Sequence, residues 1–83
     1  MEKEMKKKEF DALATSINQK FGMGEIETFY SIDQQIFWVR WVTGFATPKR
    51  INKVINSASI WNCYIDAVWK KDGKSMIAIK PMK

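Results

Sequence analysis

The sequence predicts an α+β fold whose elements run helix, strand, strand, helix, strand, strand. Three observations support this order: an apolar stripe of helical period in residues 10–21, a period-two alternation in residues 25–45, and a hairpin turn at residues 71–74. We expect a four-stranded, mainly antiparallel sheet with the N-terminal helix packed on one of its faces and a short second helix.

The first predicted helix carries five apolar side chains on one stripe, because they fall at spacings of three, four, seven and eleven residues: Phe10, Leu13, Ala14, Ile17 and Phe21. Gly22 is expected to end this helix, since glycine adopts the left-handed conformation that closes helices. Residues 1–8, with their run of three lysines, are expected to form a flexible charged lead-in.

The next two elements are predicted as a pair of strands that form a hairpin. In residues 25–32, Ile26, Thr28 and Tyr30 alternate with more polar positions, and a weak turn at Asp33-Gln34 leads into residues 36–45. The second strand is apolar on both sides. A strand of that kind is usually covered on both faces, by another layer of the fold or by another chain.

Thr47-Pro48 predicts the start of the second helix, with Thr47 as the N-cap and proline in the first helical position. We expect this helix to run to about residue 57. Residues 58–70 fit two interpretations, since they continue the helical spacing and also alternate from Trp61 to Trp69. The first is a strand and the second is one long helix over residues 48–70.

The hairpin turn favours the strand, because a hairpin needs two strands and Gly73 can supply the positive φ of the turn. A three-residue loop would place Lys70 opposite Lys74, Ala67 opposite Ile77 and Ile65 opposite Ile79. That register buries both isoleucines on the face that holds Trp61 and Trp69, so it is the register we expect.

The length of 83 residues predicts a single domain that spans residues 1–83. No apolar run of about 18 residues and no signal-peptide pattern occurs, so we expect neither a membrane span nor secretion. A lone cysteine, Cys63, cannot form a disulfide within the chain. This favours a reducing, cytoplasmic location.

The residue types argue against an enzyme. The chain has no histidine, which removes the commonest general base and zinc ligand. Cys63 lies between apolar residues, Glu25 and Glu27 have no neighbours that would complete a metal site, and Gly22-Met23-Gly24 lacks the pattern of a phosphate loop. We expect no catalytic residues, no metal, no cofactor and no small-molecule substrate.

Positive charge is concentrated in the C-terminal part of the chain. Residues 34–83 hold nine of the fourteen lysines and arginines but only two of the nine acidic residues. Two groups stand out, one on the second helix and one at the hairpin turn: Lys49, Arg50 and Lys53, and Lys70, Lys71 and Lys74. They are candidates for binding nucleic-acid phosphates, although solvated surface is the commoner role of such lysines.

If both helices pack on one side of the sheet, the opposite side keeps a group of apolar and aromatic residues without a cover. These residues are Phe29, Trp38, Arg40, Val42, Tyr64, Val68 and Met76, with Arg40 expected to pair with Asp66. We therefore expect a non-catalytic protein-interaction module that forms a homodimer or acts as a small adaptor or inhibitor of a larger protein. The alternative is a nucleic-acid-binding protein that uses the two basic groups.

Overall fold

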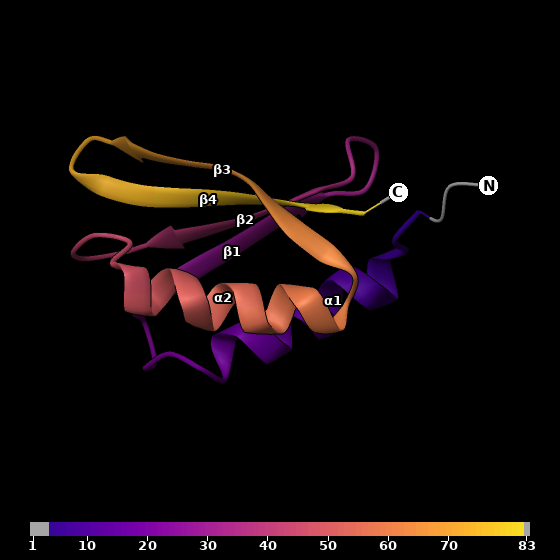
Figure 1. Ribbon diagram of the computed structural model, residues 1–83, viewed down its shortest axis with the longest axis horizontal. Coiled ribbons are helices and arrows are strands. Elements are labelled where there is room, and N and C mark those ends of the chain that lie inside the picture. The colour runs from indigo at the N-terminus through magenta and orange to yellow at the C-terminus, as the bar shows by residue number, and fades with distance from the viewer. Residues whose placement is uncertain (1–3, 83) are drawn as a thin grey trace.

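Two helices pack against one face of a four-stranded antiparallel sheet in the computed structural model, which describes residues 4–82 (Figure 1). The elements are α1 (Lys7–Asn18), β1 (Ile26–Ser31), β2 (Ile36–Trp41), α2 (Pro48–Ile60), β3 (Cys63–Lys71) and β4 (Lys74–Pro81). The strand order across the sheet is β1-β2-β4-β3. The predicted order of elements and the antiparallel sheet are confirmed.

The hydrophobic core lies between the helices and one face of the sheet. Alternate residues of the two central strands point into it and are completely buried: Phe37, Val39 and Trp41 from β2, and Ile77 and Ile79 from β4. The helices contribute the predicted stripe of α1 and the apolar side of α2: Phe10, Leu13, Ile17, Val54 and Ala58. Burial of each large side chain stabilises the fold by about 1.5–3 kcal/mol, so this one layer supplies most of the driving force.

Helix α1 begins earlier than the predicted stripe. Lys6 is its N-cap residue, and the Lys6 amide donates to Glu9 Oε1 at 3.2 Å. Within the predicted lead-in of residues 1–8, Met5 is buried and residues 7 and 8 are helical, while residues 1–3 lie outside the described part of the chain. The Gln35 side chain holds Met5 through both backbone groups, at 2.7 Å to its amide and 2.9 Å to its carbonyl oxygen.

The β1–β2 hairpin is confirmed, but β2 ends at Trp41 rather than continuing to residue 45. Gly44 adopts a φ of +80°, which an extended strand does not allow. The carbonyl oxygens of Thr43 and Phe45 accept hydrogen bonds from the Arg50 guanidinium instead of from a neighbouring strand. The chain therefore leaves the sheet before it enters α2.

Thr47 caps α2 as predicted, because its Oγ1 accepts a hydrogen bond from the Arg50 amide at 3.3 Å. The helix continues to Ile60, three residues beyond the expected end. Asn62 then adopts a φ of +55° and the chain reverses into β3. The strand interpretation of residues 63–70 is thus confirmed, and the alternative of one helix over residues 48–70 is wrong.

The β3–β4 hairpin differs from the expected register at its turn. Asp72 and Gly73 form a two-residue loop with positive φ at both positions, and Lys71 pairs with Lys74. Further along, Ile65 pairs with Ile79 as predicted, but Ala67 pairs with Ala78 rather than with Ile77. Asp66 is the extra residue between these pairs and forms a β-bulge. The bulge shifts the strand pairing by one residue between the part of the hairpin near the turn and the part that contains Ile65.

Gly73→Ala should lower the free energy of unfolding by about 1 kcal/mol, because a residue with a Cβ is strained at the Gly73 φ of +74°. No heavy atom lies within 4 Å of the added methyl group, so the cost is one of backbone conformation alone. Urea denaturation measures the change. Gly22→Ala is the matched control, because its Cβ would make only an ordinary contact; an equal loss in both variants would contradict this explanation.

Candidate protein-interaction surface

The face of the sheet opposite the helices, which we call the open face, is not covered by any element of the described chain (Figure 1). The strand register places Arg40 on it together with eight apolar or aromatic side chains: Phe29, Ile36, Trp38, Tyr64, Ala67, Trp69, Met76 and Ala78. Phe29 is 44% exposed and Tyr64 is 41% exposed. A sheet face of this composition in contact with water is unusual for an isolated domain.

Five of the seven residues predicted for this surface lie on the open face, whereas Val42 lies beyond the end of β2 and Val68 lies on the other side of the sheet. Val68 pairs with Ile77, whose side chain is in the core, so it lies on the helix side of the sheet. The reason is the bulge at Asp66, which reverses the alternation beyond Ile65. The bulge moves Ala67 and Trp69 onto the open face. The sequence does not indicate this change, because its alternation is uninterrupted from Trp61 to Trp69.

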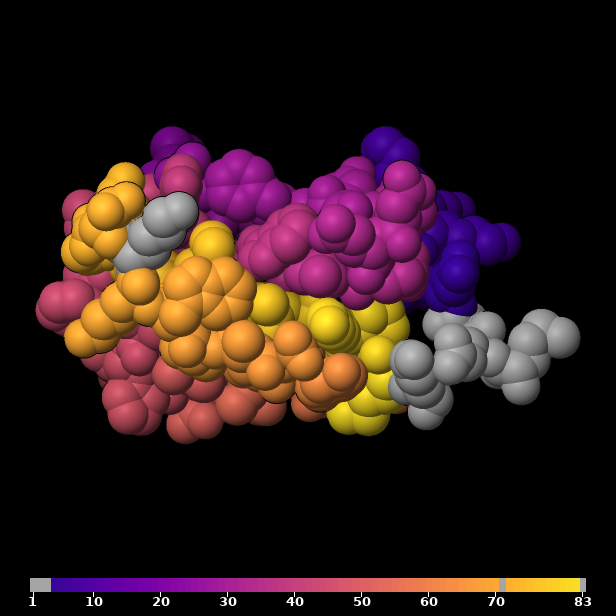
Figure 2. Space-filling model, turned by 90° about the horizontal axis from the view of Figure 1, so that it is seen from above, coloured from indigo at the N-terminus to yellow at the C-terminus, as the bar shows by residue number. Residues whose placement is uncertain are grey.

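Figure 2 looks directly onto the open face. Side chains of β1 and β2, in violet and magenta, stand on one side, and those of β3, in orange, stand on the other, with β4 in yellow between them. Near the turn of the β3–β4 hairpin, Arg40, Asp72, Lys74 and Met76 line a pocket of about 310 Å³. The open face is therefore uneven rather than flat.

Two ion pairs lie on the open face. Arg40 Nη2 lies 2.7 Å from Glu27 Oε1 on the neighbouring strand, and the Arg40 guanidinium lies 5.3 Å from the centre of the Phe29 ring. Lys80 Nζ lies 3.6 Å from Asp66 Oδ2. The expected pair between Arg40 and Asp66 is not formed, because each of these groups has an opposite charge nearer to it.

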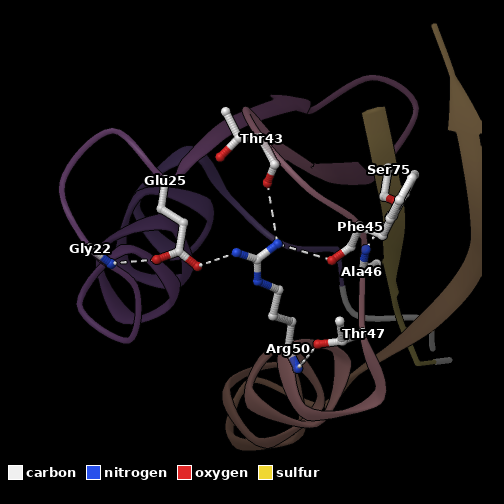
Figure 3. Close-up of polar contacts among 8 residues, drawn as sticks. All are labelled: Gly22, Glu25, Thr43, Phe45, Ala46, Thr47, Arg50 and Ser75. Carbon is white, nitrogen blue, oxygen red and sulfur yellow. Dashed lines mark hydrogen bonds and ion pairs between the residues drawn. The ribbon is translucent and has the colours of Figure 1, made fainter. Parts of the chain in front are cut away.

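Arg50, a candidate phosphate contact in the sequence, makes several contacts within the fold (Figure 3). Its Nη1 donates to the carbonyl oxygens of Thr43 at 3.3 Å and Phe45 at 3.0 Å, and its Nη2 lies 3.4 Å from Glu25 Oε2. Glu25 also accepts a hydrogen bond from the Gly22 amide. These contacts tie the segment after β2 to the start of α2 and to the start of β1.

Four other members of the two basic groups are exposed side chains. Lys49, Lys53, Lys70 and Lys74 are exposed, and none of them forms an ion pair within residues 4–82. Lys53 Nζ lies 5.5 Å from the centre of the Phe21 ring, and Lys70 Nζ lies 4.2 Å from that of Phe45. The side chain of Lys71 is outside the described part of the structure.

The Cys63 thiol is buried and lies 3.3 Å from Met5 Sδ. Burial, with a smaller effect from the Glu9 carboxylate, raises the pKa of Cys63 to about 11. A thiol in this state is a weak nucleophile near neutral pH. Within the described residues no three His, Cys, Asp or Glu side chains lie together as metal ligands would, and none of the helices described there is long and apolar enough to cross a membrane.

Comparison of the chain with protein-family models, with curated proteins and with solved structures found no match.

Arg50→Met should lower the free energy of unfolding by about 1–2 kcal/mol, because two backbone carbonyl oxygens and the Glu25 carboxylate lose their partner. Thermal denaturation followed by circular dichroism tests this. Lys49→Met removes the same charge from the exposed neighbouring residue and should leave the midpoint unchanged. Equal midpoints for the two variants would show that the Arg50 contacts contribute nothing.

The free energy of unfolding should also fall as pH rises from about 9 to about 11. The folded protein holds the Cys63 proton more tightly than the unfolded chain does, so this contribution is complete below the ordinary pKa of 9.0 and disappears as pH approaches the raised pKa. The slope reaches at most about 1.4 kcal/mol per pH unit. Urea denaturation of the protein and of Cys63→Ala at several pH values isolates the effect, which should be absent from the variant.

Proposed function

We propose that the protein is a non-catalytic interaction module that associates through its open face, with a second copy of the same chain as the partner. The observation that supports this most directly is the exposure of Phe29 and Tyr64 beside Trp38 and Trp69 on a sheet face without a cover. Aromatic side chains of this kind provide large contact areas and are enriched at protein interfaces.

The charge distribution supports a protein partner over nucleic acid on this face. Arg40 and Lys80, the cations in the middle of the open face, are each paired with a carboxylate, and among the described side chains only Lys74, at its turn end, is an unpaired cation there. The paired charges favour self-association in a chain of net charge +5. Two copies can bring the middle of their open faces together without opposing unpaired cations there.

The size of the open face sets the expected strength of the contact. Four strands, spaced by about 4.8 Å with about 3.3 Å per residue, cover roughly 500 Å² per chain, or about 1,000 Å² for a pair. This is at the lower limit for specific complexes. We therefore expect a weak dimer that dissociates on dilution, and an adaptor or an inhibitor of a larger protein would use the same face.

Sedimentation equilibrium over a wide range of protein concentrations tests the proposal. The mass should rise from 9.7 kDa toward twice that value as concentration increases. Phe29→Glu should keep the protein monomeric at every concentration, because a desolvated carboxylate opposes the contact. Ile60→Glu is the matched control, since Ile60 is 71% exposed at the end of α2, and it should dimerise like the unchanged protein.

A monomer at all concentrations would contradict the proposal that the partner is a second copy of the chain. If Ile60→Glu abolishes the dimer and Phe29→Glu does not, the open face is not the dimer contact. Circular dichroism spectra of both variants would first establish that they fold.

A further inference from the structure

We infer that the end of the molecule at the β3–β4 turn binds single-stranded nucleic acid, independently of the open face. The site consists of the exposed ring of Phe45 with Lys70 above it, and of Lys49 and Lys53 on the neighbouring first turns of α2, and we call it the basic end. These residues come from two separate parts of the chain, residues 45–53 and strand β3, and the fold brings them together.

Several contacts establish this arrangement. Lys70 Nζ on β3 lies 4.2 Å from the centre of the Phe45 ring, which belongs to the segment between β2 and α2. The next residue, Ala46, donates its amide to Ser75 Oγ on β4 at 3.0 Å, and Ser75 is the cross-strand partner of Lys70. Helix α2 begins two residues later and presents Lys49 and Lys53. Figure 1 shows the β3–β4 turn, this segment and the start of α2 together at the left of the view.

The three lysines remain available for a ligand. None of them forms an ion pair within the described residues, in contrast to Arg40, Arg50 and Lys80, each of which lies beside a carboxylate. Glu25, an acidic residue near the start of α2, is engaged by Arg50. A group of unpaired cations on one end of the molecule attracts a polyanion and orients it there.

Phe45 indicates which polyanion fits. Its side chain is 52% exposed, although phenylalanine has no polar group that would favour contact with water. A half-exposed ring among lysines offers a surface on which a base can stack while the lysines contact phosphates on either side of it. An acidic protein segment would use the lysines but would gain little from the ring.

Stacking also favours single-stranded over double-stranded nucleic acid, because the bases of a duplex are already stacked on one another. The backbone around the ring is held in place for such a contact. The Arg50 guanidinium binds the carbonyl oxygens of Thr43 and Phe45, so the segment is fixed before any ligand arrives (Figure 3). Arg50 is accordingly a positioning residue rather than a phosphate contact.

Fluorescence anisotropy with a labelled oligothymidine of about 15 nucleotides, titrated between about 50 and 200 mM salt, tests the inference. The triple variant Lys49→Gln, Lys53→Gln and Lys70→Gln should reduce the slope of log K against log salt by about 2, since each lost phosphate contact removes about 0.7. Its matched control is Lys6→Gln, Lys7→Gln and Lys8→Gln, which removes equal charge near the start of α1 and should leave the slope unchanged.

Phe45→Leu tests stacking separately from charge. It should weaken binding of the single strand roughly tenfold and should leave the salt slope unchanged. Phe29→Leu is the matched control on the open face and should bind like the unchanged protein. Phe29→Glu should bind the oligonucleotide as a monomer, so the outcome does not depend on whether the chain dimerises.

Three results would overturn the inference. Equal effects of the two triple variants would mean that net charge, rather than the basic end, attracts the oligonucleotide. Equal affinity for a duplex of the same length, or unchanged affinity of Phe45→Leu for the single strand, would show that no base stacks on Phe45. Displacement of the oligonucleotide by polyglutamate at equal charge concentration would show that an acidic polypeptide satisfies the site as well.

Discussion

One-sided burial is the constraint on which the rest of the structure depends. The chain has enough length for one hydrophobic layer, and that layer lies between α1, α2 and one face of the sheet. Phe37, Trp41, Ile77 and Ile79 of the two central strands point into it and are completely buried. Because successive side chains of a strand point to opposite sides, the same strands must present Trp38, Arg40 and Met76 on the other face, where no helix remains to cover them.

Most of the fold could be predicted from the sequence, because the relevant signals are local and redundant. The stripe from Phe10 to Ile17, the Thr47-Pro48 helix start and the Asp72-Gly73 turn each specify a short piece of backbone, and the pieces agree with one another. The later helix end at Ile60 and the earlier strand end at Trp41 depend instead on long-range contacts, such as the bonds from Arg50 to the segment after β2.

The candidate surface could be predicted only in part, and the reason is the bulge at Asp66. An inserted residue leaves the alternation of residue types in the sequence intact while it exchanges the two faces of the strand. Trp69 therefore reached the open face and Val68 left it. The role of Arg50 was hidden for a similar reason, since its partners Thr43, Phe45 and Glu25 are identified only once the chain has folded. In sequence it resembles the lysines beside it.

The bulge at Asp66 also bears on how far assembly of this protein can extend. Open-ended growth by strand addition requires a regular hydrogen-bonding edge on each side of the sheet, and β3, one of its two outer strands, is interrupted in its middle. Only the β1 edge stays regular, so a chain of sheets cannot propagate beyond a single junction. The bulge therefore disfavours the addition of a further strand at the β3 edge.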